Sequence, residues 1–387
     1  MAKLPDKDCT GCEACASVCP EGAITPRPDH EGFLRPVIDE GICTECGLCV
    51  ERCPVLDEKR GSTDVENPKV YAAWHNDPKI RGASTSGGAF SAFALEILGR
   101  GGVVFGAAFD EEFRVCHREV TDEDGLASLR GSKYIQSHVG NTFKQAKHRL
   151  EQGKDVLFSG TSCQIAGLQA YLGTQYERLF TVDLICHGTP SPELWRLYLD
   201  AMERKYRSKV VGVSLRDKRI RWQTPTMVIS FANGSEWAAP LTDSPFQVGF
   251  WNGLTLRPSC YACRFKRLPY PADITLGDFW AVELIHPKLE RDAGISLVFV
   301  NSEKGKKLFE AVSGSLFTKE SDLEFVKDHS HLLHSASVPP GREDFFAGLR
   351  EMPFEEFARR KLKTRGALLR LAAKVRRSLL CCMKSLR

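Results

Sequence analysis

The chain has 387 residues, 42% of them hydrophobic and 26% charged, a composition that excludes intrinsic disorder and fibrous repeats. This length exceeds the usual size of one domain, so we expect two or more units with a substantial core. No stretch approaches the roughly 20 uninterrupted apolar residues of a membrane span, and no apolar signal region follows the first charges. A cytoplasmic location is therefore expected.

The net charge of +4 conceals an uneven distribution. Residues 359–387 carry eleven Lys or Arg and no Asp or Glu, which leaves −7 for residues 1–358. Because a nucleic-acid-binding surface needs positive charge spread over a folded face, no nucleic acid partner is expected. The 15 cysteines are the unusual feature of the composition. In a reducing compartment, cysteines persist as thiols, catalytic groups or metal ligands rather than disulfides.

Eight cysteines form two copies of the pattern C-x2-C-x2-C-x3-C-P, which begin 34 residues apart. The copies are Cys9, Cys12, Cys15 and Cys19 before Pro20, and Cys43, Cys46, Cys49 and Cys53 before Pro54. In bacterial two-cluster ferredoxins, the fourth Cys of each such run ligates the other [4Fe-4S] cluster. We therefore predict one cluster on Cys9, Cys12, Cys15 and Cys53, and a second on Cys43, Cys46, Cys49 and Cys19. The alternative is structural zinc, which has no use for the third Cys or the Pro.

The remaining sequence predicts a mixed α/β (α+β) body. A polar stretch at residues 57–68 is typical of a linker, and it divides the chain into a ferredoxin-type module at 1–60, a larger domain at 68–345 and a basic helical tail at 346–387. Apolar runs predict strands at 69–74, 102–109, 155–159, 180–186, 209–215, 226–231, 272–277 and 295–300. Helical periodicity predicts helices at 88–99, 141–152, 162–172, 192–206 and 304–313.

Neither a Rossmann G-x-G-x-x-G motif after a strand nor a P-loop is present, so a nucleotide cofactor would need a different cradle. The candidate is a small hydroxyl-rich turn between a strand and a helix, comprising Ser84, Thr85, Ser86, Gly87 and Gly88. Backbone amides of such a turn at a helix N-terminus suit a diphosphate. The alternative is an ordinary helix cap.

Four more cysteines lie at predicted strand ends or in loops: Cys163, Cys186, Cys260 and Cys263. The last two form a C-x2-C pair in a polar context, and all four could converge on a third [4Fe-4S] cluster. For Cys163 and Cys186 the spacing alone leaves a small buried hydrophobe as an equal alternative, and for Cys116 that is the preferred interpretation.

These segments together resemble the family of coenzyme F-420 hydrogenase/dehydrogenase beta subunits. The resemblance covers most of the chain and rests on the double cysteine run, STSGGAFSAFA (84–94), RGSKYIQS (130–137), GTSCQIAGL (160–168), DLICHGTPSP (183–192) and SCYACRFKRLPYPADITLGDFW (259–280). It implies an FAD-binding α/β domain with a cluster on the four central cysteines beside the flavin. One departure is Ser162, where the family pattern has Pro before the Cys.

The resemblance also implies individual flavin contacts. The turn at 84–88 becomes a flavin contact, as do Lys133 and Tyr134. His187 either contacts the flavin or cluster, or holds a loop carbonyl. Asp278 either binds flavin or caps a turn. A flavin is the usual adaptor between two-electron and one-electron carriers, so the implied activity is flavin-dependent oxidoreduction.

Three functional classes follow from these features. The first is an FAD and iron-sulfur oxidoreductase acting on a small-molecule substrate or a deazaflavin, with a ferredoxin or another redox protein as partner. The second is an electron-transfer subunit that serves a partner enzyme, with polysaccharide biosynthesis as one setting. The third is a non-enzymatic redox sensor or scaffold.

The basic tail has three interpretations. Leu362, Leu369, Ala373 and Leu380 share roughly one helical face amid cations, which is typical of a helix that lies on a membrane surface or docks on an acidic partner. The alternative is a solvated helix over the protein's own surface. The adjacent Cys381 and Cys382 are poorly placed to chelate one cluster, and they are either acylated or surface thiols.

Overall fold

The computed structural model describes residues 3–57, 67–329 and 334–362. Residues 58–66 of the expected linker at 57–68 lie outside the described residues, as does most of the basic tail, with Leu369, Ala373, Leu380, Cys381 and Cys382. No helix in the described part of the chain has both the length and the apolar character needed to cross a membrane.

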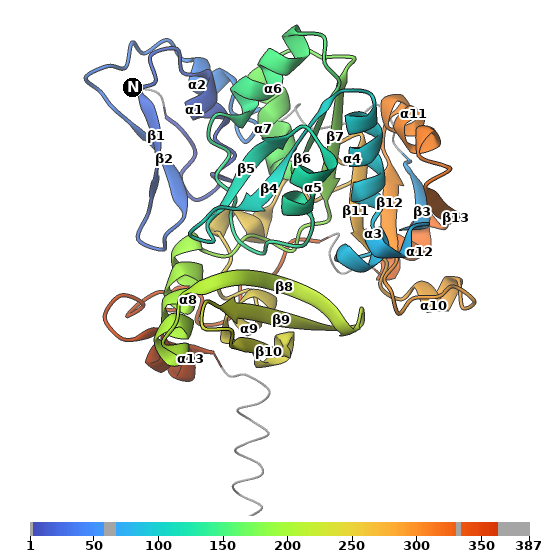
Figure 1. Ribbon diagram of the computed structural model, residues 1–387. Helices are drawn as coiled ribbons and strands as arrows, with labels where there is room; N and C mark the ends of the chain where they lie inside the picture. Colours follow the sequence, from blue (N-terminus) through green and yellow to red (C-terminus); the bar gives the residue numbers. More distant parts are fainter. Residues whose placement is uncertain (1–2, 58–66, 330–333, 363–387) are drawn as a thin grey trace, which may run out of the picture.

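The N-terminal module is a β-hairpin with two short helices, drawn in blue in Figure 1. Its elements are α1 (Ala14–Val18), β1 (Ile24–Pro28), β2 (Leu34–Ile38) and α2 (Leu48–Glu51). The two strands pair antiparallel. Asp29 closes the hairpin because its carboxylate accepts the backbone N–H groups of Glu31 and Phe33, each at 2.9 Å.

One mixed sheet of eight strands forms the body. Its strands are β3 (Lys69–His75), β4 (Val103–Phe109), β5 (Val115–Val120), β6 (Val156–Thr161), β7 (Leu179–Leu184), β11 (Ile274–Asp278), β12 (Ser296–Val300) and β13 (Leu316–Ser321). The strand order is β13-β3-β12-β11-β7-β6-β4-β5. The central neighbours β11, β7, β6 and β4 run parallel, and antiparallel strands flank them. The segments that follow β6, β7 and β11 therefore leave the sheet at one edge.

Helices cover both faces of this sheet. Residues of α4 (Ala89–Gly99), α5 (Glu123–Leu129) and α11 (Glu303–Ala311) share one core cluster, and residues of α6 (Thr142–Glu151) and α7 (Ser162–Leu172) share another. The strands contribute side chains to both core clusters, because successive side chains point to opposite faces of the sheet. Val104 belongs to the first cluster and Phe105 to the second. Cys12 and Ala14 also belong to the second cluster, so the N-terminal module packs on the α6 and α7 side.

A smaller layer lies below the main sheet in Figure 1. It is an antiparallel sheet of β8 (Val210–Arg221), β9 (Thr224–Phe231) and β10 (Glu236–Pro240), accompanied by α8 (Pro192–Tyr206), α9 (Pro245–Trp251) and α13 (Phe354–Lys361). Trp195, Phe246 and Phe357 lie in its core cluster. Leu362, expected on the exposed helix of a basic tail, is buried in the same cluster.

The remaining elements are short. They are α3 (Pro78–Ala83), η1 (Leu241–Asp243), η2 (Pro258–Ala262), α10 (Val282–Ile285) and α12 (Leu323–His329). All eight strands and all five helices predicted for the body are present, with ends displaced by a few residues except for β8, which continues six residues further. The partly buried Cys116 lies on β5, a strand that the apolar pattern does not predict.

Candidate iron-sulfur and flavin site

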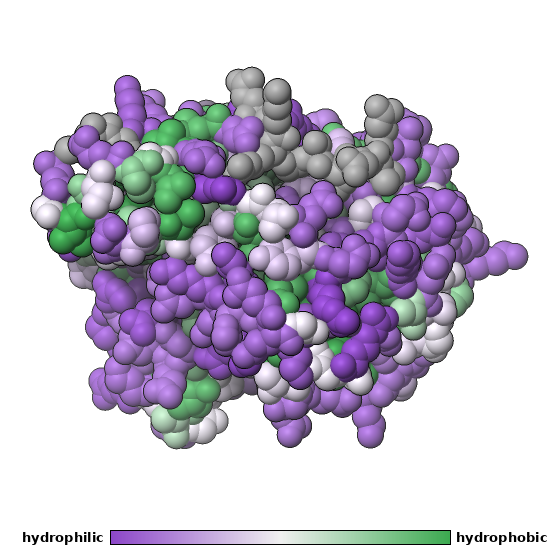
Figure 2. Space-filling view, turned by 90° about the horizontal axis from the view of Figure 1, so that it is seen from above, coloured by the Kyte–Doolittle hydropathy of each residue, from purple (hydrophilic) through white to green (hydrophobic). Residues whose placement is uncertain are grey.

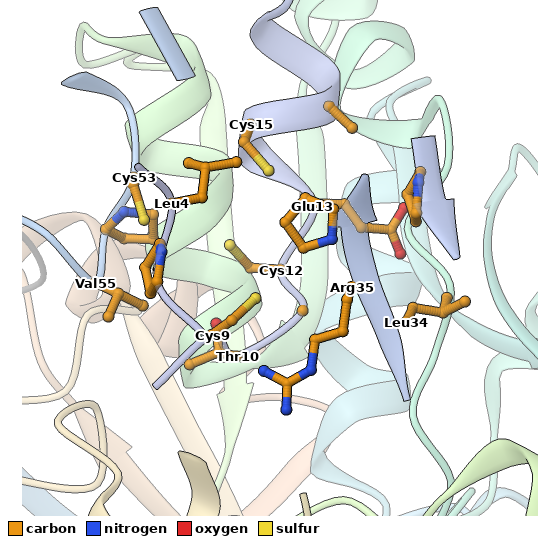
Figure 3. A pocket seen from close by; sticks show the side chains of 16 residues that line it. Leu4, Cys9, Thr10, Cys12, Glu13, Cys15, Leu34, Arg35, Cys53 and Val55 are labelled. Carbon is orange, nitrogen blue, oxygen red and sulfur yellow. The ribbon is translucent and has the colours of Figure 1, made fainter. Parts of the chain in front are cut away.

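Four cysteines from the two ends of the N-terminal module line one small cavity. In Figure 3 the side chains of Cys9, Cys12, Cys15 and Cys53 turn toward a common space. Cys53 of the second run therefore joins the first three cysteines of the first run, the combination that the spacing predicts. We call these residues the inner set; their role as ligands stays a prediction.

The other four cysteines of the module line a second cavity. Cys19, Cys43, Cys46 and Cys49 all border it. We call them the outer set, because Cys46 is exposed and the other three are partly buried. A cluster held here would be closer to solvent than one held by the inner set.

The protonation of the inner set bears on what it can hold. Burial raises the pKa of Cys15 to about 12, with the charges of Cys9 and Cys53 adding to the effect. Burial also raises the pKa of Cys12 and Cys53. Cluster ligands must be thiolates, and buried thiolates that repel one another need a compensating positive charge. The irons of a cluster would supply that charge, so the inner set fits such a group.

A single metal ion makes different demands. Within residues 3–57, 67–329 and 334–362, no three His, Cys, Asp or Glu side chains converge in the way that would hold one ion. Thiolates around zinc lie about 2.3 Å from the metal and crowd together, whereas a cubane holds its four thiolates at the corners of a larger body. Both cysteine sets of the module are therefore better suited to [4Fe-4S] clusters than to a single ion.

Four further cysteines meet at the edge where the parallel strands end. Cys163 lies in the first turn of α7 after β6, Cys186 follows β7, Cys260 lies in η2, and Cys263 directly follows η2. Burial, and then the charges of Cys260, Cys163 and Cys263, raise the pKa of Cys186. The thiols therefore lie within electrostatic range of one another. We call them the central set; their role as cluster ligands also stays a prediction.

Donors surround the central set. The hydroxyl of Thr161 lies 3.2 Å from the sulfur of Cys163, and that of Thr189 lies 3.6 Å from the sulfur of Cys260. Two further donors, Lys266 Nζ and the Tyr270 hydroxyl, are buried and have no hydrogen-bond partner among the described residues. Burial lowers the pKa of Lys266, and the neighbouring central-set thiols oppose this.

The inner and central sets approach each other along one face of α7. A β-carbon added to Gly167 would stand 2.9 Å from Cβ and 3.1 Å from the sulfur of Cys12. Cys163 lies one helical turn before Gly167 on the same helix. The charge of Cys12 contributes to the raised pKa of Cys163, after burial and Cys263. The two cysteine sets therefore lie close together.

Arg257 joins the module to the body from a fully buried position. Its guanidinium donates to the carbonyl oxygens of Cys9 at 2.6 Å and Leu34 at 3.0 Å, and to the Gln136 side chain at 3.0 Å. It also lies 3.5 Å from the sulfur of Cys9 and interacts electrostatically with Cys260. One side chain thus connects an inner-set cysteine with a central-set cysteine.

Two buried carboxylates complete this junction. Glu13 accepts the backbone N–H groups of Val139 and Gly140, each at 3.0 Å, and lies 2.9 Å from the His138 ring. Glu31 forms a two-pronged ion pair with Arg342, at 2.7 and 2.6 Å. Bidentate pairs of this kind fix orientation as well as distance. The module is therefore held in one position on the body.

The predicted phosphate cradle lies against β12. The hydroxyl groups of Ser84 and Ser86 donate to the carbonyls of Ile80 and Ile295, each at 2.8 Å. Gly88, with a φ of +92°, is the N-cap of α4, so the turn leads directly into the helix and both the phosphate and the helix-cap interpretations stay open. The Thr85 hydroxyl oxygen accepts the backbone N–H of Ser132 at 2.9 Å, and this bond connects the turn to the segment that carries Lys133 and Tyr134.

Of the other predicted flavin contacts, Lys133 is held by backbone carbonyls, and His187 and Tyr134 both contact Phe250. Lys133 donates to the backbone carbonyls of Ser128, Arg130 and Gly131, and burial lowers its pKa to about 7. His187 lies 3.2 Å from the carbonyl oxygen of Phe250, as its loop-holding interpretation requires. Phe250 also packs on Tyr134, with ring centroids 5.0 Å apart.

Asp278, at the end of β11, has a buried partner on β8. It pairs with Arg216 and accepts the indole N–H of Trp222 at 3.1 Å. Trp222 in turn stacks on Trp280 with a centroid separation of 4.6 Å. Arg216 interacts electrostatically with Tyr134 as well, so Tyr134 and Asp278 meet through it.

Sequence reasoning missed the contribution of β8. Besides Arg216, this strand carries Lys218, whose ammonium donates to the carbonyls of Arg81, Ser86 and Ala293 at 2.6 to 3.0 Å. Burial lowers the pKa of Lys218 to about 8. The second half of β8 is a run of mostly charged residues, which is typical of an exposed strand, and nothing in the pattern indicates that it crosses the end of another sheet.

The surface of the N-terminal module carries a few exposed apolar side chains. The face shown in Figure 2 is mostly hydrophilic, with hydrophobic residues toward its left edge, the side on which the N-terminal module lies in Figure 1. Large apolar side chains exposed on the module are Val37, Ile42 and Leu56. They lie on the same module as the exposed Cys46 of the outer set.

Comparisons with known proteins agree with this architecture. The C-terminal and N-terminal regions of the coenzyme F420 hydrogenase/dehydrogenase beta subunit match residues 153–324 and 70–144, and the 4Fe-4S dicluster domain matches residues 8–56. One of the subunits of the F(420)H(2) dehydrogenase of Methanosarcina mazei is 22% identical over 315 residues, which are 79% of this chain and 82% of that protein.

Two further similarities are more limited. The coenzyme F420-dependent sulfite reductase of Methanocaldococcus jannaschii is 27% identical over 186 residues, 47% of this chain and 28% of that protein. A chain from the structure of the F420-reducing [NiFe] hydrogenase complex of Methanosarcina barkeri is 19% identical, with a TM-score of 0.47 and coverage of 72% of this chain and 89% of that chain.

Fold and sequence together define an iron-sulfur protein of oxidoreductase type, with a ferredoxin module on an α/β body. The chain belongs to the family of coenzyme F420 hydrogenase/dehydrogenase beta subunits.

Proposed function

We propose that this chain is an iron-sulfur flavoprotein that passes electrons between [4Fe-4S] clusters and an FAD, which exchanges hydride with a small-molecule substrate or a deazaflavin. When bound, the clusters would carry single electrons, and the flavin would connect them to two-electron chemistry. The proposal assigns a cluster to each of the three cysteine sets and retains the division into units at 1–60, 68–345 and 346–387.

The observation that carries this proposal is the approach of Cys12 to Cys163 across Gly167. A ferredoxin module that merely stored electrons would not need a body cysteine beside its inner set. With outer, inner and central sets in succession, the side chains of this chain would hold three clusters in a row from the surface inward. The buried ties of Arg257, Glu13 and Glu31 would keep their separations constant.

The flavin assignment is supported by the residues gathered around β8. Ser86, Tyr134 and Asp278 each interact with Arg216 or Lys218, and His187 joins the group through Phe250. Arg216, which lies over the Trp280 ring, and the neighbouring cation Lys218 would bind and orient an anionic cofactor with a planar ring system. His187 directly follows Cys186, so a group bound here would lie next to the central set.

A second candidate is an electron-transfer subunit without a substrate of its own. It is favoured by the name of a relative, one of the subunits of an F(420)H(2) dehydrogenase, and by the exposed Cys46 of the outer set. In that case a ferredoxin or another redox protein would exchange electrons at the outer set, and a partner enzyme would supply the substrate site.

The test compares two cysteine variants purified without oxygen. Cys260→Ser should lose about a third of the iron and acid-labile sulfide, because one of three clusters loses a ligand. Cys116→Ser is the matched control, since Cys116 is also partly buried but belongs to none of the three sets. Equal iron content in both variants would refute the central cluster. Reduction of bound flavin by a deazaflavin donor, without a partner protein, would favour the first candidate over the second.

A further inference from the structure

A buried ammonium near three thiols of the central set calls for an explanation. Lys266 Nζ is buried and has no hydrogen-bond partner among the described residues, although an ammonium carries three donors. Its electrostatic neighbours are Cys186, Cys263 and Cys260, three of the four cysteines of the central set. A buried charge of this kind is retained only when a partner of opposite charge compensates it.

Tyr270 presents a second such donor four residues further along. The residue is 1% exposed, and its hydroxyl also has no partner among the described residues. It lies within electrostatic range of Asp183 and then of Cys186 and Cys263. Its ring packs edge-on against Phe299, with centroids 5.8 Å apart, which holds it on the β12 side. Two independent donors thus lie beside the same thiols without an acceptor.

The acceptor they lack has a recognisable chemistry. It must be negatively charged, must accept several hydrogen bonds, and must lie near Cys186 and Cys263. A [4Fe-4S] cluster with four thiolates has sulfur acceptors on every side and a net negative charge, and hydrogen bonds to its sulfurs set its potential.

We propose that Lys266 and Tyr270 donate to the cluster held by the central set and raise its reduction potential above the value that the four cysteines alone would give. The inference rests on the proposed function, because it needs a cluster at Cys163, Cys186, Cys260 and Cys263. The reduced cluster carries one more negative charge than the oxidised cluster, so a nearby ammonium stabilises the reduced form more.

This arrangement gives the central cluster a definite place in the electron path. The hydroxyls of Thr161 and Thr189 lie beside Cys163 and Cys260. Together with Lys266 and Tyr270, they place four polar side chains around the central set. Cys46 of the outer set is exposed to water instead. A central cluster of raised potential would accept electrons from the module readily and hold them beside the proposed flavin.

The experiment is an anaerobic redox titration of the full chain, followed by electron paramagnetic resonance. The step that belongs to the central cluster is the one absent from Cys260→Ser. In Lys266→Met this step should move to a more negative potential, and in Tyr270→Phe it should move in the same direction by less. Lys266→Arg keeps the charge and should restore most of the wild-type value. Lys306→Met, at an exposed position on α11, is the control and should leave every step in place.

Several outcomes separate this inference from the proposed function. A central step at the wild-type potential in both Lys266→Met and Tyr270→Phe overturns the inference and leaves the cluster standing. Loss of flavin from Lys266→Met with an unmoved step also overturns it, because Lys266 would then serve the flavin. If Lys266→Met fails to assemble a cluster, Tyr270→Phe decides by the same criterion. A wild-type chain with only two steps and about eight irons contradicts the third cluster itself.

Discussion

Cys12 of the module and Gly167 of α7 touch so closely that no larger residue fits at position 167. A β-carbon there would stand 2.9 Å from Cβ of Cys12, closer than side-chain carbons approach in folded proteins. Because Cys12 belongs to the inner set and Cys163 begins the same helix, this contact connects two proposed clusters.

Gly167→Ala should therefore loosen the inner set. The extra methyl group forces Cys12 or α7 to shift, and overpacking of this kind costs about 1–3 kcal/mol. We expect a lower midpoint of thermal unfolding and a lower iron content. The matched control is Gly82→Ala in α3, where an added β-carbon meets nothing within 4 Å and should be neutral or stabilising. Identical unfolding and iron content in the two variants would show that the contact is not tight.

Removing Arg257 should weaken the junction between module and body. Arg257→Leu leaves the carbonyls of Cys9 and Leu34 and the Gln136 side chain without their donor in a buried place, at about 1–3 kcal/mol for each unsatisfied group. Denaturant unfolding should show a loss of several kcal/mol. Arg257→Lys should recover only part of it, because an ammonium lacks the planar fork. The exposed Arg267→Leu is the control, and a comparable loss there would contradict this role.

His117 should make the protein sensitive to mild acid. Burial lowers its pKa to about 4 from the ordinary 6.5, and its ring lies 2.7 Å from the Ser137 hydroxyl and 3.0 Å from the Ser159 carbonyl. The folded state therefore favours the neutral ring. The contribution of the neutral His117 ring to the free energy of unfolding is complete above about pH 6.5 and is lost as the pH falls toward 4.

Between about pH 7.5 and about pH 5.5, this effect should lower the free energy of unfolding by about 1 kcal/mol in the wild-type chain. His117→Gln should be less stable at neutral pH but should lack this part of the pH dependence. His148→Gln, at an exposed position, should keep it. Parallel pH profiles for wild type and His117→Gln would contradict a buried neutral His117.

The stacked pair of Trp222 and Trp280 should matter for flavin binding. Trp280 is 40% exposed, so Trp280→Ala should leave the fold and the iron content nearly unchanged while the flavin content falls severalfold. Trp251→Ala removes an equally large side chain that is 44% exposed on α9. We expect it to retain flavin at the wild-type level, measured as extracted FAD per iron. Equal flavin contents in the two variants would exclude the Trp pair from the cofactor site.

How much could be predicted from the sequence depends on the range of the interactions involved. The fourth cysteine of each run, Cys19 or Cys53, lines the cavity formed by the other run. This arrangement was predictable, because it follows from the ligand spacing within each run. The strands were predictable from their apolar runs. For Cys163 and Cys186 the spacing left two interpretations open, and the two residues meet because β6 and β7 are parallel neighbours that end at one edge of the sheet.

Contacts between distant segments could not be predicted in this way. Arg257 lies 248 positions from Cys9, and no periodicity indicates that its guanidinium enters the module. The sequence around Cys260 indicates only a polar context for Lys266, whose burial depends on how residues 259–271 fold against β7 and β12. The pairing of Arg216 with Asp278 likewise required the crossing of β8 over the end of β11, which is a property of the tertiary fold.

The most direct test of three clusters beside one flavin is the cofactor content of the unmutated chain. The protein would be purified without oxygen, and iron, acid-labile sulfide and extractable flavin would be measured per polypeptide. We expect about twelve irons, as many sulfides and about one FAD. About eight irons and no flavin would contradict this arrangement, and would leave a two-cluster electron carrier whose central cysteines and β8 cations serve another purpose.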